Sequence, residues 1–304
     1  MDVELPNFEG QEQDTLYFIG NGFDLFHGLK TKFIHFYSWL NLEDEEHEQF
    51  VTNMEELFYT TGIHGNELWK NFEEALGKVD VDYIHDSFSG EEVDKFGDED
   101  FQKRASKHLN HVTQRIPQYL WEWIDYTKVS KAICHPSLHL HKQSKYLTFN
   151  YTTLLEERYN IPDNQINHIH GSYKRPPLIT GHGNYIPEKK EDPHSWNVEQ
   201  SWKNIFNEAK RLRKNVSEII SQNKAYFDSL ENISNVIVFG HSLSQIDRPY
   251  FEEVIHHVKD GTNWYFVYYN EDDRKKYERL IGRYAPYQRK KIRQELCNFI
   301  QITN

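Results

Sequence analysis

The chain is poor in cysteine and has no long apolar run, and each shortage excludes a class of protein. Its 304 residues include two cysteines, Cys134 and Cys297. Two thiols are too few for a disulfide framework or a four-thiolate zinc site, so we expect ordinary reduced cysteines. No apolar run approaches the roughly 18 residues that a membrane helix requires. We therefore expect no membrane association.

A secretory signal and an excess of basic charge are also missing. Residues 1–6 have neither a basic start nor an apolar core, so we expect a cytoplasmic protein. The net charge is −12, with 25 acidic and 5 basic residues in positions 1–100 and 22 acidic and 30 basic residues after them. An acidic chain repels nucleic acid at long range, which disfavours a nucleic-acid partner. The basic stretch from Arg274 to Arg293 alternates with acids and aromatics, and we interpret it as a solvated helix face.

Apolar segments of strand length alternate with segments of helical spacing. This alternation predicts an α/β protein with a Rossmann-like parallel sheet, covered by helices on both faces. The expected strands are Thr15–Ile19, Lys145–Asn150, Gln165–His170, Leu178–Gly181, Val236–Gly240 and Trp264–Tyr269. The expected helices are Thr31–Leu40, Thr152–Tyr159, Glu188–Ser229, Asp247–Val258 and Asp272–Leu280.

We expect residues 1–304 to form one domain with helical insertions at about 41–130 and 188–230. The first insertion carries acidic clusters and aromatic residues at helical spacing, among them Trp69 and Phe72. Such stripes are most simply explained as core contacts.

Polar residues follow three of the expected strands, in Gly20–Asp24, Asn150–Thr152 and Gly240–Leu243. Ligands of open parallel sheets bind beyond the carboxyl ends of the strands. We therefore predict one pocket for a nucleotide-type ligand at this edge.

The first of these segments, Gly20, Asn21, Gly22 and Phe23, is predicted to hold the phosphates of the ligand. Glycine lets backbone amides approach a pyrophosphate. The third glycine of the dinucleotide fingerprint is missing, so a plain tight turn stays open as an alternative. The next residue, Asp24, would repel a phosphate, and we assign it to ribose hydroxyls or a reacting sugar centre.

Histidines at 168 and 170 end the third expected strand. Alternate residues of a strand share a face, which predicts that both point the same way. A metal pair with His182 as a third ligand, a structural role, and a catalytic base at His170 are the alternatives. No carboxylate lies at a supporting spacing, so we predict no metal, and imidazole suits proton transfer near neutral pH.

Together these motifs resemble the AbiH family of bacterial phage abortive-infection proteins. The resemblance spans nearly the whole chain in the right order. The matching segments are Ile19–Leu25, His27–Thr31, Trp69 with Phe72 and Glu73, Thr148–Thr152, His168–Gly171, Gly181–Asn184, and Gly240–Leu243 with Asp247.

A more distant similarity connects the motifs with sirtuins and sirtuin-like NAD hydrolases. It implies a sirtuin-type NAD-binding fold in which Asn150 positions a water or a ribose hydroxyl and His170 acts as general base. It further implies a ligand-binding role for Thr152, Gly240, His241, Ser242 and Asp247. The zinc-binding cysteine tetrad is absent, which argues against a protein deacylase. Two positions depart from the sirtuin pattern, since Thr152 replaces an aspartate and Asp24 a serine.

The two resemblances imply an antiphage effector that hydrolyses the nicotinamide N-glycosidic bond of NAD, as a substrate, without a required cofactor. Unchecked loss of NAD would kill the host, so such an enzyme implies control by a phage-derived activator or by homo-oligomeric assembly. Two alternatives stay open: a nucleotide-binding sensor without catalysis, which Thr152 favours, and an RNA-cleaving toxin, which the basic stretch favours.

Overall fold

A computed structural model of the chain describes residues 2–42, 44–58, 62–79, 98–183, 196–287 and 290–303. The chain divides into two compact units. The sheet unit comprises Met1–Thr31, Ile124–Pro177 and Val216–Asn304, and the helical unit comprises Lys32–Trp123 and Leu178–Asn215. Most described residues of the expected insertions fall in the helical unit, whereas residues 124–130 and 216–230 belong to the sheet unit. Residues 43, 59–61, 80–97 and 188–195 of those insertions lie outside the described residues.

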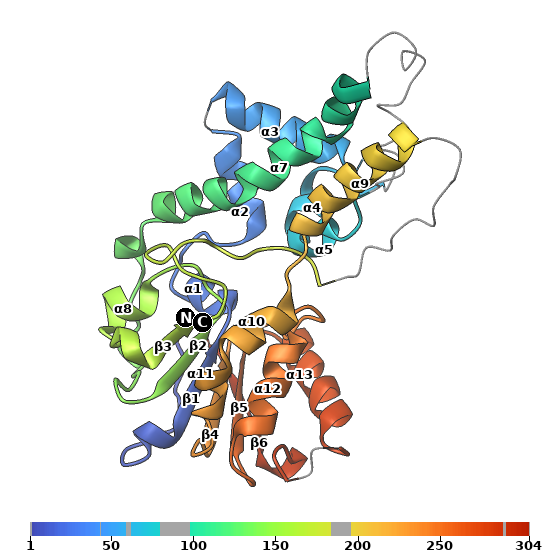
Figure 1. Ribbon diagram of the computed structural model, residues 1–304. Coiled ribbons are helices and arrows are strands. Elements are labelled where there is room, and N and C mark those ends of the chain that lie inside the picture. The colour runs from blue at the N-terminus through green and yellow to red at the C-terminus, as the bar shows by residue number, and fades with distance from the viewer. Residues whose placement is uncertain are drawn as a thin grey trace. The chain divides into compact units, whose positions relative to one another are not determined.

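Six parallel strands form one sheet in the order β3-β2-β1-β4-β5-β6 (Figure 1). The strands are β1 (Thr15–Ile19), β2 (Lys145–Thr148), β3 (Ile166–His168), β4 (Asn235–Phe239), β5 (Asn263–Tyr268) and β6 (Cys297–Gln301). The expected α/β class with a parallel sheet is therefore confirmed. This order is typical of doubly wound folds, and it reverses between β1 and β4, where such folds have a crevice beyond the strand ends.

Helices cover the sheet on both faces. They are α1 (Asn21–Phe26), α8 (Leu154–Tyr159), α10 (Val216–Gln222), α11 (Lys224–Asp228), α12 (Arg248–His257) and α13 (Glu271–Tyr284). Short 3₁₀ turns lie at Glu12–Asp14, Val129–Lys131, Asp163–Gln165 and Gln294–Leu296. On one face Phe251 of α12 packs edge-on against Phe18 and Trp264. On the other, Tyr17 stacks on Tyr146 at 4.8 Å within the core cluster that includes residues of α1 and α8.

Two expectations about the strands are wrong. Residues 178–181 are not a strand: His182 N donates to Leu212 O and Lys214 N donates to His182 O, so this extended segment follows the chain after α9 (Trp196–Arg211). Conversely, the sequence pattern does not predict β6. It is a half-exposed edge strand, and partial exposure weakens the apolar run that marks a buried strand.

The helical unit packs around a cluster of aromatic rings. Its helices are α2 (Phe33–Leu40), α3 (Glu45–Glu56), α4 (Gly65–Lys70), α5 (Phe72–Leu76), α7 (Asp98–Thr127, whose last residues belong to the sheet unit) and α9. The Phe36 ring contacts the rings of Trp69, Phe72 and Trp123, at centroid distances between 5.2 and 6.1 Å. Trp69 and Phe72 are fully buried, so their expected role as core contacts is confirmed.

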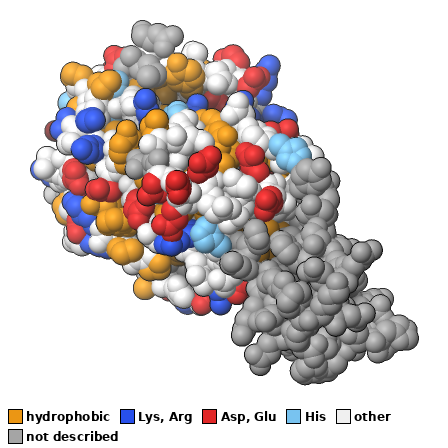
Figure 2. All heavy atoms as spheres, turned by 90° about the horizontal axis from the view of Figure 1, so that it is seen from above, with side chains coloured by type: hydrophobic (Ala, Val, Ile, Leu, Met, Phe, Trp, Pro, Cys, Tyr) orange, Lys and Arg blue, Asp and Glu red, His pale blue; other side chains and the backbone are white. Residues whose placement is uncertain are grey.

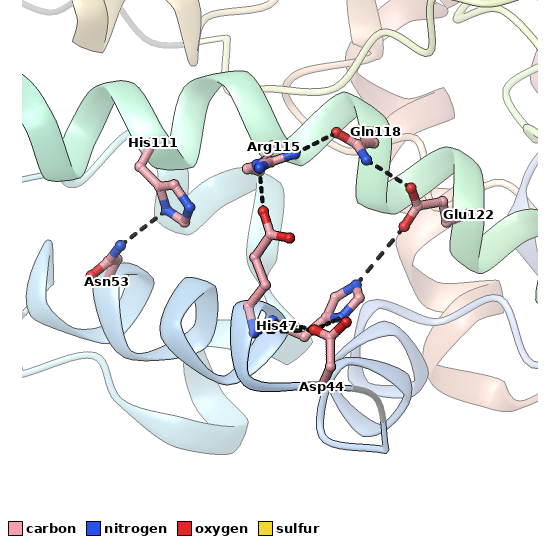
Figure 3. Close-up of polar contacts among 8 residues, drawn as sticks. Asp44, His47, Asn53, His111, Arg115, Gln118 and Glu122 are labelled. Atoms are coloured by element: carbon pink, nitrogen blue, oxygen red, sulfur yellow. Dashed lines mark hydrogen bonds and ion pairs between the residues drawn. The ribbon is translucent and has the colours of Figure 1, made fainter.

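A polar network joins α3 to α7 (Figure 3). The His47 ring lies between Asp44, with Nδ1 3.0 Å from Oδ1, and Glu122, with Nε2 3.9 Å from Oε2. Further along, Asn53 Nδ2 lies 3.0 Å from His111 Nδ1, and Arg115 forms an ion pair with Glu46. These contacts hold the two helices side by side.

A buried ion pair connects α5 with the segment after α9. Lys214 Nζ lies 2.9 Å from Glu73 Oε1, and the lysine side chain is completely buried. Thr180 Oγ1 donates to the same oxygen at 3.3 Å. Two segments of the AbiH resemblance, around residues 73 and 181, thus lie next to each other in the helical unit and contribute to its stability.

Loss of the Glu73 carboxylate should destabilise the helical unit strongly. The Glu73→Ala protein removes the carboxylate that pairs with the buried Lys214 ammonium, and loss of one partner of a buried ion pair costs about 3 kcal/mol or more. Lys214→Met should lower the free energy of unfolding by less, because the partly exposed Glu73 carboxylate can remain hydrated. Urea unfolding followed by tryptophan fluorescence measures both, and equal stabilities for Glu73→Ala and the wild type would contradict the assignment.

Two basic residues of α13 form ion pairs with acidic residues of the same helix. Arg274 pairs with Glu278 at 3.1 Å and Lys276 with Asp273 at 3.2 Å, as expected for a solvated helix face. On the face of the molecule drawn in Figure 2, acidic and basic side chains lie interspersed. No helix within the described ranges has both the length and the apolar character needed to cross a membrane.

Candidate functional site at the carboxyl edge of the sheet

Three glycines meet where the end of β1 passes the end of β4. A Cβ on Gly22 would lie 2.6 Å from Gly240 Cα, and a Cβ on Gly240 would lie 2.3 Å from Phe23 N. A Cβ on Gly20 would lie 2.5 Å from His241 Cα. Backbone packing inside the sheet unit therefore requires these glycines, whatever ligand the edge binds.

The amides of the glycine segment already have acceptors in the protein. Gly20 N donates to Phe239 O at 2.9 Å, and Gly22 N donates to Gly240 O at 2.7 Å. α1 begins at Asn21 directly after the strand, so Asn21, Gly22 and Phe23 form a helical turn. Any phosphate bound at this edge is therefore held by donors other than the Gly20 and Gly22 amides.

Asp24 joins the ends of β1 and β2. Its Oδ1 accepts a hydrogen bond from Asn150 Nδ2 and its Oδ2 accepts one from Thr152 Oγ1, both at 2.8 Å. The three side chains are all buried. Residues assigned to the site from two separate motifs are therefore direct neighbours.

The Asp24 carboxyl group has an unusual affinity for its proton. Burial raises the pKa of Asp24 to about 7, although the hydrogen bonds from Thr152 and Asn150 favour the ionised form. A buried carboxyl group that titrates near neutral pH is typical of sites that move protons or stabilise positive charge.

Asn150 is held at three of its four polar atoms. Its backbone N donates to Thr148 Oγ1 at 3.2 Å, its backbone O lies 3.0 Å from His168 Nδ1, and its side-chain Nδ2 is bound to Asp24. The remaining atom, the side-chain carbonyl Oδ1, is buried without a hydrogen-bond partner. An acceptor in a fixed position is thus present at the end of β2.

His168 and His170 do not share a face, which corrects the expectation from strand periodicity. β3 ends at His168, and the chain turns at Ile169 and His170. The His168 ring contacts Asn150 O and Glu156, whereas the His170 ring is buried against Phe149 and Tyr250. Within the described ranges no group of three or more histidine, cysteine, aspartate or glutamate side chains is arranged to hold a metal ion.

His170 lies in an aromatic cluster at the same edge as the glycines. Its Nε2 is 3.4 Å from Tyr250 OH, and Phe149 contacts both His170 and His241. Because Gly20 packs directly against His241, the ends of β1, β2, β3 and β4 are joined through this cluster.

The turn after β4 contributes one exposed and two buried polar groups. His241 Nδ1 accepts a hydrogen bond from Leu243 N at 2.9 Å, so the neutral ring carries its proton on Nε2, 3.9 Å from Asp247 Oδ2. The Ser242 side chain is exposed, as is Asn21, which bonds to Thr31. Among the residues predicted to bind the ligand, Ser242 therefore carries an exposed hydroxyl group, whereas the Thr152 hydroxyl is bound to Asp24.

Two groups of this edge had no role in the sequence prediction. Glu156 of α8 binds His168, and Tyr250 of α12 approaches His170. Both lie on helices, far in sequence from the strand-end motifs, and nothing in their local pattern separates them from ordinary helix residues.

The fold and this edge define the class: an α/β protein with a six-stranded parallel sheet and polar residues from four strand ends gathered at one edge. Residues 16–268 match the family model described as Bacteriophage abortive infection AbiH. The chain belongs to the AbiH family. Searches of curated proteins and of solved structures found no match.

Proposed function

We propose that the carboxyl edge of the sheet binds an NAD-type nucleotide and hydrolyses the bond between nicotinamide and ribose. In an abortive-infection protein this reaction would stop growth of the infected cell by removing NAD. The chemistry needs an acceptor that fixes a ribose hydroxyl or water, a base, and negative charge near the sugar. Oxygen and nitrogen atoms suited to each task lie at this edge.

The fixed carbonyl of Asn150 is the observation that carries the proposal. Its Oδ1 is buried without a partner while the rest of the residue is held in place. Leaving a buried acceptor unpaired costs free energy, about 1–3 kcal/mol, and a ligand hydroxyl or water removes that cost. Asn150 is therefore assigned to orient the attacking water or a ribose hydroxyl.

Asp24 is assigned to stabilise positive charge on the ribose, and His170 is assigned to accept a proton. Cleavage of a glycosidic bond develops positive charge on the ribose ring, which a nearby carboxylate stabilises. Asp24 supplies that carboxylate in its ionised form, and it lies beside Thr152, where the sirtuin pattern has an aspartate. His170 acts as general base, and Ser242 contributes to phosphate binding.

Release of nicotinamide from NAD by the purified protein tests the proposal. Asn150→Ala and His170→Ala should each lower the rate at least about 100-fold, the usual effect of removing a positioned acid–base or orienting group. His139→Ala, which removes an exposed histidine of the same unit, should leave the rate unchanged and serves as the matched control.

Three other outcomes would overturn hydrolysis as the function. Wild-type rates in the His170→Ala protein would remove this mechanism. Tight binding of NAD in calorimetry without release of nicotinamide would identify a sensor. Growth arrest with intact NAD and fragmented RNA would identify the RNA-cleaving alternative.

A further inference from the structure

His168 and Glu156 form a second polar pair beside Asn150. His168 Nε2 lies 2.8 Å from Glu156 Oε1, and the two side chains are 5% and 15% exposed. The other ring nitrogen, Nδ1, lies 3.0 Å from Asn150 O. A single histidine thus connects the carboxylate of α8 to the backbone of the residue that carries the proposed site.

The two contacts together define the protons of the ring. A backbone carbonyl can only accept, so His168 Nδ1 must carry a hydrogen. With Glu156 as an ionised acceptor, Nε2 carries the second hydrogen and the ring is an imidazolium. The other oxygen of the carboxyl group, Glu156 Oε2, is buried without a hydrogen-bond partner, so an ionised carboxylate at this position requires a positive charge beside it.

We propose that His168 and Glu156 form a buried ion pair whose imidazolium holds the Asn150 backbone, which makes His168 a positioning residue for NAD hydrolysis. This role rests on the proposed function. Asp24 fixes the Asn150 side chain and His168 fixes its main chain, so Oδ1 is oriented from both sides. A charge-assisted hydrogen bond is shorter and stronger than a neutral one, which suits it to this task.

Two substitutions of His168 separate its two hydrogen bonds. The amide nitrogen of asparagine can occupy the position of the imidazole Nδ1, so His168→Asn keeps the bond to Asn150 O. The longer glutamine places its amide near the Nε2 position, so His168→Gln keeps the bond to Glu156 instead. His168→Gln should lower kcat about 100-fold with little change in KM, since small displacements of a reacting group have effects of this size. His168→Asn should retain about a tenth or more of the wild-type kcat.

Nitrogen NMR of the histidine rings tests the ion pair without any enzymatic readout. In the wild-type protein at neutral pH, His168 should give the signals of a doubly protonated ring. In Glu156→Gln the glutamine amide can donate to Nε2 while Nδ1 still donates to Asn150 O, so the ring should become neutral with both contacts kept. A neutral His168 in the wild type would overturn the ion pair.

The positioning role and the proposed function fail in different ways. Equal kcat values for His168→Gln and His168→Asn in an active enzyme would overturn the positioning role alone. A wild-type protein that releases no nicotinamide would overturn the proposed function and the positioning role, while the ring signals would still decide whether the ion pair exists. Backbone amide spectra of each variant establish that it is folded.

Discussion

Gly240→Ala should prevent stable folding of the sheet unit. The new methyl group would lie 2.3 Å from Phe23 N and 2.5 Å from Gly22 C, and the backbone at Gly240 has φ +66°. Neither side can retreat, because Gly22 N is bonded to Gly240 O and Gly20 N to Phe239 O. We expect a loss of more than about 4 kcal/mol in unfolding free energy, a size reserved for steric conflicts of this kind.

Two other glycines provide matched controls for this prediction. Gly261 has φ +78° but open space around it, so Gly261→Ala should cost only the left-handed backbone penalty, about 1–2 kcal/mol. Gly282 lies within α13 with open space, and Gly282→Ala should stabilise by up to about 1 kcal/mol. Urea unfolding of the three variants measures these differences. Similar midpoints for Gly240→Ala and Gly261→Ala would contradict the predicted steric conflict between a Cβ at position 240 and the backbone of Gly22 and Phe23.

The strand ends could be predicted from the sequence because two signals coincide there. A buried strand such as Thr15–Ile19 or Asn235–Phe239 is a short apolar run, and the residue after it is a glycine in both cases. The rule that parallel strands end at one edge then brings the motifs together without knowledge of the strand order. The observed contact between Gly22 and Gly240 follows from that rule.

The partners of the motif residues could not be predicted in the same way. The sequence assigns Asp24 to a ligand, whereas its carboxylate binds two neighbours from the end of β2. Glycine at 22 suggests an opening for phosphate, yet its amide is used by the backbone of β4. A motif specifies which groups are present, but side-chain bonds across strands depend on the three-dimensional arrangement.

Edge elements were the weakest part of the prediction for a related reason. β6 is half exposed, and residues 178–181 form an extended segment outside the sheet. Both have compositions compatible with a strand, and only long-range pairing distinguishes them. The short helix α1 was missed as well, since six residues carry less than two turns of periodic signal.

Asp24 should make the stability of the protein fall as pH rises from about 4 to about 7. Burial raises the pKa of Asp24 from 3.8 to about 7 in the folded protein. Between these values the folded state keeps a proton that the unfolded chain has released, so raising the pH favours unfolding, and the effect levels off above pH 7. A difference of about three pKa units corresponds to about 4 kcal/mol.

Asp24→Asn should remove this pH dependence and leave the local structure intact. The asparagine oxygen can accept from Asn150 Nδ2, and its amide can donate to Thr152 Oγ1, whose hydroxyl turns to accept. The variant should therefore match the wild type near pH 4 and exceed its stability at pH 8 by a few kcal/mol, in the sense given by the pKa shift. The same variant should lose nicotinamide release, because the neutral amide cannot stabilise a positively charged ribose.

Asp44→Asn is the matched control, because it makes the same aspartate-to-asparagine change at an exposed position. The exposed Asp44 carboxylate accepts backbone and side-chain hydrogen bonds of His47, which lower its pKa, so its contribution to stability has the opposite sign: it is lost as pH falls. Urea unfolding of the three proteins at pH 4, 5, 6, 7 and 8 tests the Asp24 prediction, and over this range Asp44→Asn should follow the pH trend of the wild type, because the lowered pKa of Asp44 places its titration below it. Parallel pH profiles for the wild type and Asp24→Asn would show that the buried carboxyl group titrates as in the unfolded chain. In that case Asp24 would be ionised throughout the neutral range, and its charge would have to be balanced by a group other than its two hydrogen-bond donors.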